Sequence, residues 1–315
     1  MDPRHVVAVD IGASKTLLSV RAADRPSDDW QVGQDVLRRA TDRDPVALAD
    51  WIAGSAQGLS GATPAAIGVA LPGPLDADRG VVTRSSNLGW DDVPLAEMLS
   101  QRLGAPTVLE DDANSAALGE WRFGAGEQVD PFAYLTVSSG IGGGIVVGGA
   151  VVRGARGNAG EVGHIVIDPH GPPCACGRRG DIESFAGGVA LERRAHAAWP
   201  SGLTSDGSPA PRTAAEVFAA AAHGDATARV LVEDATKAVA AALAALAAVL
   251  EPRRIVVGGS IGMKQQTMVQ LSAELARQQV MAENGRSLDV HAAALGEESV
   301  LAGAATLAQR RAERT

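Results

Sequence analysis

A layout that occurs twice limits what this 315-residue chain can fold into. In the first copy, the β-branched run at residues 5–9 leads through a short turn of small residues into a second run at residues 16–20. In the second copy, residues 132–137 lead through the glycine-rich turn 138–144 into residues 145–147. Aliphatic and β-branched runs broken by glycine are typical of strands joined by tight turns. The repeat therefore predicts two similar halves, each offering a small-residue turn toward a shared cleft.

The other patterns alternate between strands and helices. Short apolar runs indicate strands at 66–71, 107–109, 255–257 and 290–294. Apolar residues at helical spacing indicate helices at 45–59, 95–103, 115–121, 214–222, 226–250 and 299–309. Alternation of this kind predicts an α/β protein, and the length is typical of about two domains.

Composition and charge exclude several classes of function. A formal net charge of −9 makes a nucleic-acid partner unexpected, because phosphate binding needs a basic face. The longest apolar run, 238–250, is too short to span a bilayer, and the N-terminus has no signal-peptide profile. The two cysteines are closely spaced, which argues against a disulfide framework and for reduced thiols. We therefore expect a cytoplasmic protein without a membrane partner.

The segment 157–183 gathers acids, a histidine and both cysteines. These are Glu161, His164, Cys174, Cys176 and Glu183, and six glycines lie among them. Glycine permits backbone bends that a Cβ would prevent, so the segment is suited to wrapping a small polar ligand or a metal. A surface loop with chance cysteines is the simpler interpretation. We favour the site, because these residue types rarely coincide with so many glycines.

Three acids follow the strand predicted at 107–109. Glu110, Asp111 and Asp112 lie where that strand ends and the next helix begins. Acids are favoured at helix N-termini by the helix dipole, so ordinary capping is one interpretation. Three successive acids exceed what a cap requires, and we therefore favour a functional site.

Two further patterns suggest a bound nucleotide. The turn at 10–15 combines Asp10 with Gly12 and small residues, so backbone N–H groups can approach an anion and Asp10 can hold Mg²⁺ directly or through water. A plain hairpin turn would have the same pattern. Gly258 and Gly259 break a strand just before a helix, which lets a nucleotide lie against the backbone. The turn at 138–144 is no Rossmann or P-loop fingerprint, because a strand follows it.

Together these motifs resemble those of the ROK family of bacterial sugar kinases and sugar-responsive repressors, over nearly the whole chain. DIGASK at 10–15 is similar to the family's phosphate motif DIGGTK, and EDDAN at 110–114 to its catalytic ENDAN. Residues 137–164 match the family signature, and CACGRRGDIE at 174–183 resembles the metal motif CxCGxxGCxE. The departures from the family pattern are Ser14 and Ser139 for Thr, Asp111 for Asn, and Asp181 for the third Cys.

The resemblance implies an α/β, two-domain actin-like ATPase (ribonuclease H-like) fold with a cleft between the domains. The smaller domain would hold residues 1–117 and 298–315, with the last helix crossing back to it, and the larger one residues 118–297. It also implies transfer of the ATP γ-phosphate to the C6 hydroxyl of a hexose, with Mg²⁺, in a homodimer. A repressor of the family carries an N-terminal helix-turn-helix, and we expect none, because a strand begins at residue 5.

The resemblance also implies a role for each matched residue. Asp112 would be the general base. Sugar hydroxyls would contact Asn87, Asp111, Asp112, Glu161, His164 and Glu183. The phosphates and Mg²⁺ would contact Asp10, Gly12, Ser14, Lys15, Ser139, Gly140, Gly142, Gly258 and Gly259. A structural zinc ion would bind His164, Cys174, Cys176 and Asp181, since Zn²⁺ accepts imidazole, thiolate and carboxylate ligands. The alternative is a degenerate, empty site, because one thiolate is missing.

Asp111 leads to a hypothesis about the sugar. In family members that act on glucose, the matching Asn hydrogen-bonds a ring hydroxyl near position 3. An ionised Asp can only accept hydrogen bonds, and its charge lies beside that of Asp112. An ammonium group on the sugar would relieve that repulsion. We therefore favour an amino sugar, 3-amino-3-deoxyglucose (kanosamine), which some relatives phosphorylate for antibiotic biosynthesis. A glucokinase, another ROK hexose kinase and a non-catalytic sugar-responsive regulator are the alternatives.

Overall fold

The computed structural model describes residues 4–23, 30–85, 87–204 and 207–314, and its strands and helices confirm the α/β class. The chain divides into two compact units. Unit 1 comprises Met1–Gln128, Gly144–Ala159 and Glu297–Thr315, and unit 2 comprises Val129–Gly143 and Gly160–Gly296. The boundary expected at 117/118 falls inside helix α3 (Asp112–Phe123), which unit 1 contains whole. The last helix lies in unit 1, as the resemblance implies.

The elements of unit 1 follow the predicted alternation, with additional short strands. They are β1 (His5–Ile11), β2 (Lys15–Ala22), β3 (Val36–Ala40), α1 (Pro45–Ser60), β4 (Ala66–Leu71), β5 (Leu75–Asp76), β6 (Val81–Ser85), β7 (Trp90–Val93), α2 (Leu95–Leu103), β8 (Thr107–Asp111), α3, β11 (Ala150–Val151) and α11 (Ser299–Ala312), which the 3₁₀ turn η2 (Gly296–Glu298) precedes.

The main sheet of unit 1 has the strand order β3-β2-β1-β4-β8. Strands β1, β4 and β8 run parallel, and their registers pair Asp10 with Ala70 and Leu71 with Asp111. The carboxyl ends of parallel strands meet at one edge of a sheet, which is where ligands bind in open α/β sheets. The register therefore brings Asp10 and Asp111 to the same edge.

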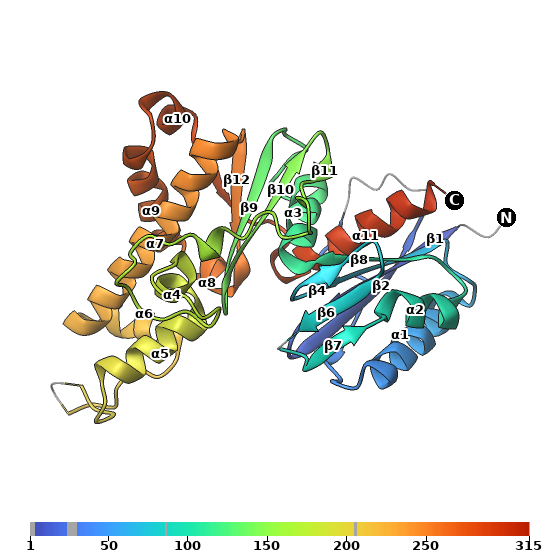
Figure 1. Cartoon of the computed structure of the whole chain (residues 1–315), viewed down its shortest axis with the longest axis horizontal. Helices are drawn as coiled ribbons and strands as arrows, with labels where there is room; N and C mark the ends of the chain where they lie inside the picture. The colour runs from blue at the N-terminus through green and yellow to red at the C-terminus, as the bar shows by residue number, and fades with distance from the viewer. Residues whose placement is uncertain (1–3, 24–29, 86, 205–206, 315) are drawn as a thin grey trace. The chain divides into compact units, whose positions relative to one another are not determined.

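Both faces of this sheet are covered by helices (Figure 1). Side chains alternate along β1, so Val7 and Val9 pack in the core that includes α1, whereas Ala8 packs with Leu301 of α11. Helix α11 approaches the sheet closely, since a Cβ on Gly68 would lie 2.0 Å from the carbonyl oxygen of Ala304. The all-apolar sequence of β4 is the expected consequence of burial on both faces.

Unit 2 holds the second copy of the layout and most of the remaining helices. Its elements are β9 (Phe132–Val137), β10 (Ile141–Val147, which passes into unit 1 after Gly143), η1 (Val162–His164), α4 (Ile182–Ala186), α5 (Gly188–Ala198), α6 (Ala214–Ala222), α7 (Ala226–Leu250), β12 (Arg254–Gly258), α8 (Gly259–Lys264), α9 (Gln266–Gln279), α10 (Ala282–Ser287) and β13 (Val290–Ala292).

The second sheet repeats the topology of the first. Its order is β11-β10-β9-β12-β13, so in both sheets the third, second, first, fourth and fifth strands stand side by side. This confirms the repetition predicted from the sequence. Helix α7 packs on α9 and is capped by Asp225, whose carboxylate accepts from the backbone N–H of Ala228 at 2.8 Å. Across the described ranges, no helix combines the length and apolar character needed to cross a bilayer.

Candidate active site

The carboxyl edge of the first sheet collects acidic side chains of unit 1. Asp10 is the next-to-last residue of β1, Asp111 closes β8, and Asp112 is the first residue of α3. Asp10 is buried, and its pKa is raised to about 7, first by burial and then by the nearby charge of Asp112, while Lys15 acts to lower it. A buried carboxylate crowded by a second one is a suitable ligand for a divalent cation, which removes the repulsion. Asp10 therefore fits the predicted role toward Mg²⁺.

The turn after β1 has the predicted form. The backbone N–H of Gly12 donates to the carbonyl of Lys15 at 2.9 Å, and the hydroxyl of Thr41 donates to the carbonyl of Gly12 at 2.7 Å. Ser14 is exposed at the tip. The ammonium group of Lys15 lies 2.7 Å from Glu297, and this bond holds the pKa of Glu297 below its usual value. The turn thus has a buried acid, Asp10, just before it and a partly exposed cation, Lys15, just after it.

The three acids after the predicted strand 107–109 have three different environments. Glu110 is buried and accepts hydrogen bonds from Arg153 at 2.7 Å and from Asn114 at 3.2 Å. Asp111 caps helix α3, because its Oδ1 accepts from the backbone N–H groups of Ala113 and Asn114 at 2.9 and 3.2 Å. Capping therefore explains Asp111 in part, and an ion pair explains Glu110. Asp112 opens α3 near enough to Asp10 for their charges to interact, and its role as general base stays a prediction.

Asn87, the other predicted sugar ligand of unit 1, lies in the turn between β6 and β7 with its side chain exposed. The adjacent Leu88 donates its backbone N–H to the carbonyl of Ser85 at 3.1 Å, which closes the turn. The predicted contact of Asn87 with a sugar stays a prediction.

In unit 2, the four predicted zinc ligands come together. The ligand atoms of His164, Cys174, Cys176 and Asp181 all lie within 4.8 Å of one another. Nδ1 of His164 is 3.1 Å from Oδ2 of Asp181 and 3.9 Å from Sγ of Cys174, and Sγ of Cys176 is 3.5 Å from the same Oδ2. Ordinary Zn–S and Zn–N bond lengths place tetrahedral ligand atoms about 3.3–3.8 Å apart. The donor set fits zinc, and the three separations given above lie close to this range.

Electrostatics in this cluster also suit a cation. Burial, followed by the neighbouring Asp181, raises the pKa of the Cys174 thiol to about 12. Burial acts to raise the pKa of Asp181 as well, but hydrogen bonds from Cys174, His164 and the backbone of Ser184 together bring it below its ordinary value. A metal ion would reverse the effect on the thiol, because coordination deprotonates it. Asp181 therefore offers an ionised oxygen where the family motif has a thiolate.

The cluster is in contact with both predicted sugar-binding acids of unit 2. Nε2 of His164 is 3.9 Å from a carboxylate oxygen of Glu161, and Sγ of Cys174 is 3.9 Å from Oε1 of Glu183. The other oxygen of Glu183 accepts from the backbone N–H of Ile141 at 2.9 Å. An ion bound here would hold the loop that carries both acids, which is a structural role.

The second small-residue turn is shorter than the sequence suggests. Only 138–140 form the turn, and Ile141 already begins β10, so Gly142 lies within a strand. The backbone N–H of Ser138 donates to the carbonyl of Gly140 at 3.0 Å, and Ser139 is exposed at the tip. The run of glycines that follows is explained by packing, since a Cβ on Gly143 would lie 2.7 Å from the carbonyl oxygen of Gly160.

The Gly258–Gly259 junction likewise has a packing explanation. A Cβ on Gly258 would lie 2.1 Å from the hydroxyl of Tyr134, and Gly259 has φ +81° with its Cβ position 2.5 Å from the carbonyl of Val137. These close approaches to β9 require glycine whether or not a nucleotide binds. Their predicted contact with the nucleotide stays a prediction.

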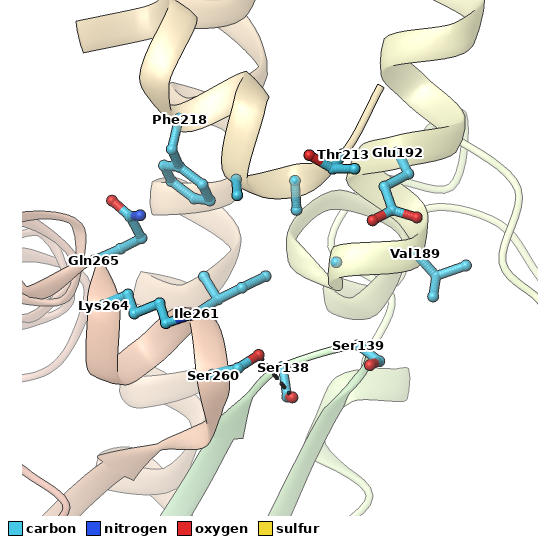
Figure 2. Close-up of a pocket in the computed structure, with 13 residues that line it drawn as sticks. Ser138, Ser139, Val189, Glu192, Thr213, Phe218, Ser260, Ile261, Lys264 and Gln265 are labelled. Carbon is cyan, nitrogen blue, oxygen red and sulfur yellow. Dashed lines mark hydrogen bonds between the residues drawn. The ribbon is translucent and has the colours of Figure 1, made fainter. Parts of the chain in front are cut away.

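A pocket of about 220 Å³ lies next to this junction in unit 2 (Figure 2). It is lined by Ser138, Ser139, Gly188, Val189, Glu192, Thr213, Ala214, Ala215, Phe218, Ser260, Ile261, Lys264 and Gln265. The hydroxyls of Ser138 and Ser260 are 3.1 Å apart at one side of it. Apart from Ser139, none of the lining residues was singled out from the sequence. Most of them come from α5, α6 and α8 or from residues next to these helices and share no local motif, and α5 itself was not predicted.

Comparisons with known proteins agree with the motifs. The model of the ROK family matches residues 6–311. A glucokinase of Thermotoga maritima is 34% identical over 251 residues, which cover 78% of this chain and 79% of the relative. An N-acetylmannosamine kinase of Shigella flexneri is 30% identical over 305 residues, or 96% of this chain and 98% of the relative.

Solved structures give the same result. A ROK hexokinase from Thermus thermophilus has a TM-score of 0.83 at 34% identity and covers 99% of this chain and 100% of its own. A ROK family glucokinase from Streptomyces griseus, in complex with glucose and AMPPNP, has a TM-score of 0.76 at 31% identity and covers 97% of this chain and 99% of its own. The fold is therefore the two-domain actin-like ATPase fold, as the motifs imply, and the chain belongs to the ROK family.

Proposed function

We infer that this member of the ROK family is an ATP-dependent sugar kinase, and we propose that it phosphorylates the C6 hydroxyl of an amino sugar such as kanosamine. The kinase activity is supported by relatives named glucokinase and N-acetylmannosamine kinase, and by the related structure that holds glucose and AMPPNP. The choice of sugar rests on Asp111.

Asp112 is the proposed general base. As the C6 oxygen attacks the γ-phosphorus, Asp112 would take the hydroxyl proton, the new O–P bond would form, and ADP would leave with the electron pair of the broken bond. Asp112 opens α3 at the sheet edge where Asp10 lies near the end of β1, close enough for its charge to raise the pKa of Asp10. Mg²⁺ held through Asp10 would neutralise phosphate charge, and Lys15 offers a further cation at the same turn.

The observation that carries the sugar assignment is the cap of α3. Both capping bonds go to Oδ1 of Asp111, and an ionised carboxylate has acceptors only. An Asn in the same pose would cap with its oxygen and present an NH₂ donor with the rest of its amide. Asp111 presents an acceptor instead. The site of this chain should therefore select a sugar whose matching substituent donates.

A hydroxyl and an ammonium group both donate, and charge decides between them. Asp111 and Asp112 are adjacent, and Asp10 is near enough to Asp112 for their charges to interact. A neutral hydroxyl leaves that negative charge uncompensated, whereas an ammonium forms a charge-assisted hydrogen bond, worth about 1.5–3 kcal/mol. The amino sugar should therefore lead glucose by roughly tenfold to a hundredfold in kcat/KM.

Glucose is the second candidate acceptor, with Asp111 accepting from its 3-hydroxyl, and the glucokinase relative favours it. A non-catalytic regulator is the third candidate. The retention of Asp10, Asp112 and both small-residue turns supports an enzyme over a regulator.

Kinetics with matched variants test the assignment. ATP turnover would be measured with kanosamine, glucose and N-acetylmannosamine for the unmodified enzyme and for Asp111→Asn. Asn caps helices as well as Asp does, so the variant should stay folded and lose most of the preference for kanosamine. Asp78→Asn, at an exposed position, is the control and should keep the preference. Higher kcat/KM for glucose than for kanosamine in the unmodified enzyme would reject the amino sugar.

We also propose that the pocket of unit 2 holds the nucleoside of ATP. The exposed Ser139 turn lies at one side of it, and Phe218, Ile261 and Val189 supply apolar walls. Complete small-molecule sites usually measure about 300–1,000 Å³, so a pocket of 220 Å³ suits part of a nucleotide, with the phosphates outside it.

A further inference from the structure

The nucleoside pocket contains polar side chains that the fold does not use. Among the residues that the structure describes, the side chains of Glu192, Lys264 and Gln265 make no hydrogen bond or ion pair. Glu192 is the only carboxylate of the lining and is half-buried on α5. A partly buried charge that stabilises nothing in the protein costs free energy unless a ligand completes its hydrogen bonds.

Figure 2 shows how the lining is arranged. The carboxylate of Glu192 points into the pocket on the same side as Thr213 and Val189, and Phe218 and Gln265 lie on the opposite side. Ser138 and Ser139 stand at the end of the pocket between these two sides. An aromatic wall, an acceptor opposite it and a hydroxyl-bearing turn therefore surround one small space.

We propose that Glu192 selects a ribonucleotide donor by accepting hydrogen bonds from the 2′- and 3′-hydroxyls of its ribose. The proposal rests on the proposed function, in which this pocket holds the nucleoside of ATP. Glu192 then acts as a specificity-determining residue for the phosphate donor.

The chemistry of the nucleotide supports this pairing. A carboxylate only accepts, and its two oxygens match the two donors of a cis-diol. Phosphates cannot lie against Glu192, since both are anionic, and they belong at the Ser138–Ser139 end. With the base against Phe218, the ribose occupies the middle of the pocket, and its hydroxyl edge is left to face Glu192.

The exocyclic amino group of adenine is the other donor that Glu192 could bind. In that arrangement the residue would distinguish ATP from GTP, which carries a carbonyl at that place, and would ignore the ribose. The two assignments predict different donor preferences, so one set of measurements separates them.

The experiment compares ATP, 2′-deoxy-ATP, 3′-deoxy-ATP and GTP as donors, at saturating sugar, in the unmodified enzyme and in Glu192→Ala. We expect each deoxynucleotide to fall behind ATP by roughly tenfold to a hundredfold in kcat/KM, the scale for hydrogen bonds to a charged group, and the loss to appear mainly in KM. Glu192→Ala should bring ATP and both deoxynucleotides within about threefold of one another, and Glu192→Gln, which keeps one acceptor, should recover part of the preference.

Glu233→Gln is the control, because it removes an exposed carboxylate from α7 outside the pocket, and it should keep the full preference for ATP. Equal use of ATP and the deoxynucleotides by the unmodified enzyme would overturn the proposal. The proposal would also be overturned if Glu192→Ala changed only the ratio of kcat/KM for ATP to kcat/KM for GTP. Calorimetric binding of AMPPNP and 2′-deoxy-ATP needs no sugar. It therefore tests Glu192 even if no hexose is phosphorylated, an outcome that would reject the proposed function instead.

Discussion

Asp111 of unit 1 and Asp181 of unit 2 both cap a helix, but the structures around them differ. Each residue caps a helix through its Oδ1 atom, and its second carboxylate oxygen lies at the same helix N-terminus. Oδ1 of Asp111 accepts from the backbone N–H groups of Ala113 and Asn114, and Oδ1 of Asp181 accepts from that of Ser184 at 2.9 Å. Both also replace another residue of the family motif, Asn in the first case and Cys in the second. The surroundings differ, because α3 has 12 residues and continues a strand of the main sheet, whereas α4 has 5 and follows a loop.

The two carboxylates are held in place by different parts of the structure. The backbone of Asp111 is fixed by the ladder between β4 and β8 and by the length of α3, so its position needs no ligand. The backbone of Asp181 takes part in a single isolated bridge, to Val166, and its second oxygen belongs to the His–Cys–Cys–Asp cluster. We expect the geometry of unit 1 to be independent of metal and that of the 157–183 loop to depend on it.

The largest effect should come from a substitution in unit 1, whose geometry we expect to be independent of metal. Asp112→Asn should lower kcat by roughly two or more orders of magnitude, the scale for loss of a general base, and should leave sugar affinity within about tenfold. Single-turnover rates and sugar binding would be measured with and without chelator, and with Asp78→Asn as a control. A variant with near-normal kcat would remove Asp112 as the base.

Metal removal should affect the 157–183 loop of unit 2. Protein purified without chelator should contain about one zinc ion per chain, as a four-ligand structural site requires. Stripping it should raise the KM for the sugar by roughly tenfold, the lower end of the range for loss of supporting groups, and lower the unfolding midpoint. Zinc analysis, KM and thermal unfolding would be measured before and after re-addition of zinc. If the protein contains no zinc, or if its KM for the sugar does not change when zinc is removed, the degenerate, empty site is favoured.

The smallest expected effects are the losses of stability when each of the two helix caps is removed. Asp111→Ala should cost about 1 kcal/mol of stability, as loss of a helix cap usually does, and equally with or without chelator. Asp181→Ala loses a cap and a ligand, so it should cost more than Asp111→Ala in zinc-loaded protein and about the same in chelator. Denaturant unfolding of both variants, with and without chelator, gives the comparison. Equal costs in the zinc-loaded state would show that the cluster does not bear on stability.

The strand–turn–strand repeat was predictable because its pattern is local. Aliphatic runs broken by glycine specify β1, β9 and their turns without information from distant residues, and the same is true of helices such as α6 and α7, whose predicted bounds match the structure. The His–Cys–Cys–Asp cluster was also predictable, since its members lie within 18 residues of one another.

The remainder of the candidate site depends on packing that no short pattern records. The role of Glu110 was missed because Arg153 is distant in sequence. Capping was one interpretation of the three acids, but the helix was predicted to begin at residue 115, so the sequence did not identify Asp111 as the cap. Glu192 and Phe218 line the same pocket because α5 and α6 pack together. Long-range pairing of this kind requires the fold itself.

Helix α11 has a consequence for how the chain acquires its fold. The buried face of β1 that contains Ala8 is covered by Leu301, Ala304 and Ala305 of α11, nearly 300 residues later in the sequence. A ribosome therefore makes all of unit 2 before this face of the first sheet can be covered. Contacts of such high sequence separation form slowly, and uncovered apolar strands are prone to aggregate. The nascent chain should thus be most dependent on chaperones in the interval before residues 299–312 emerge.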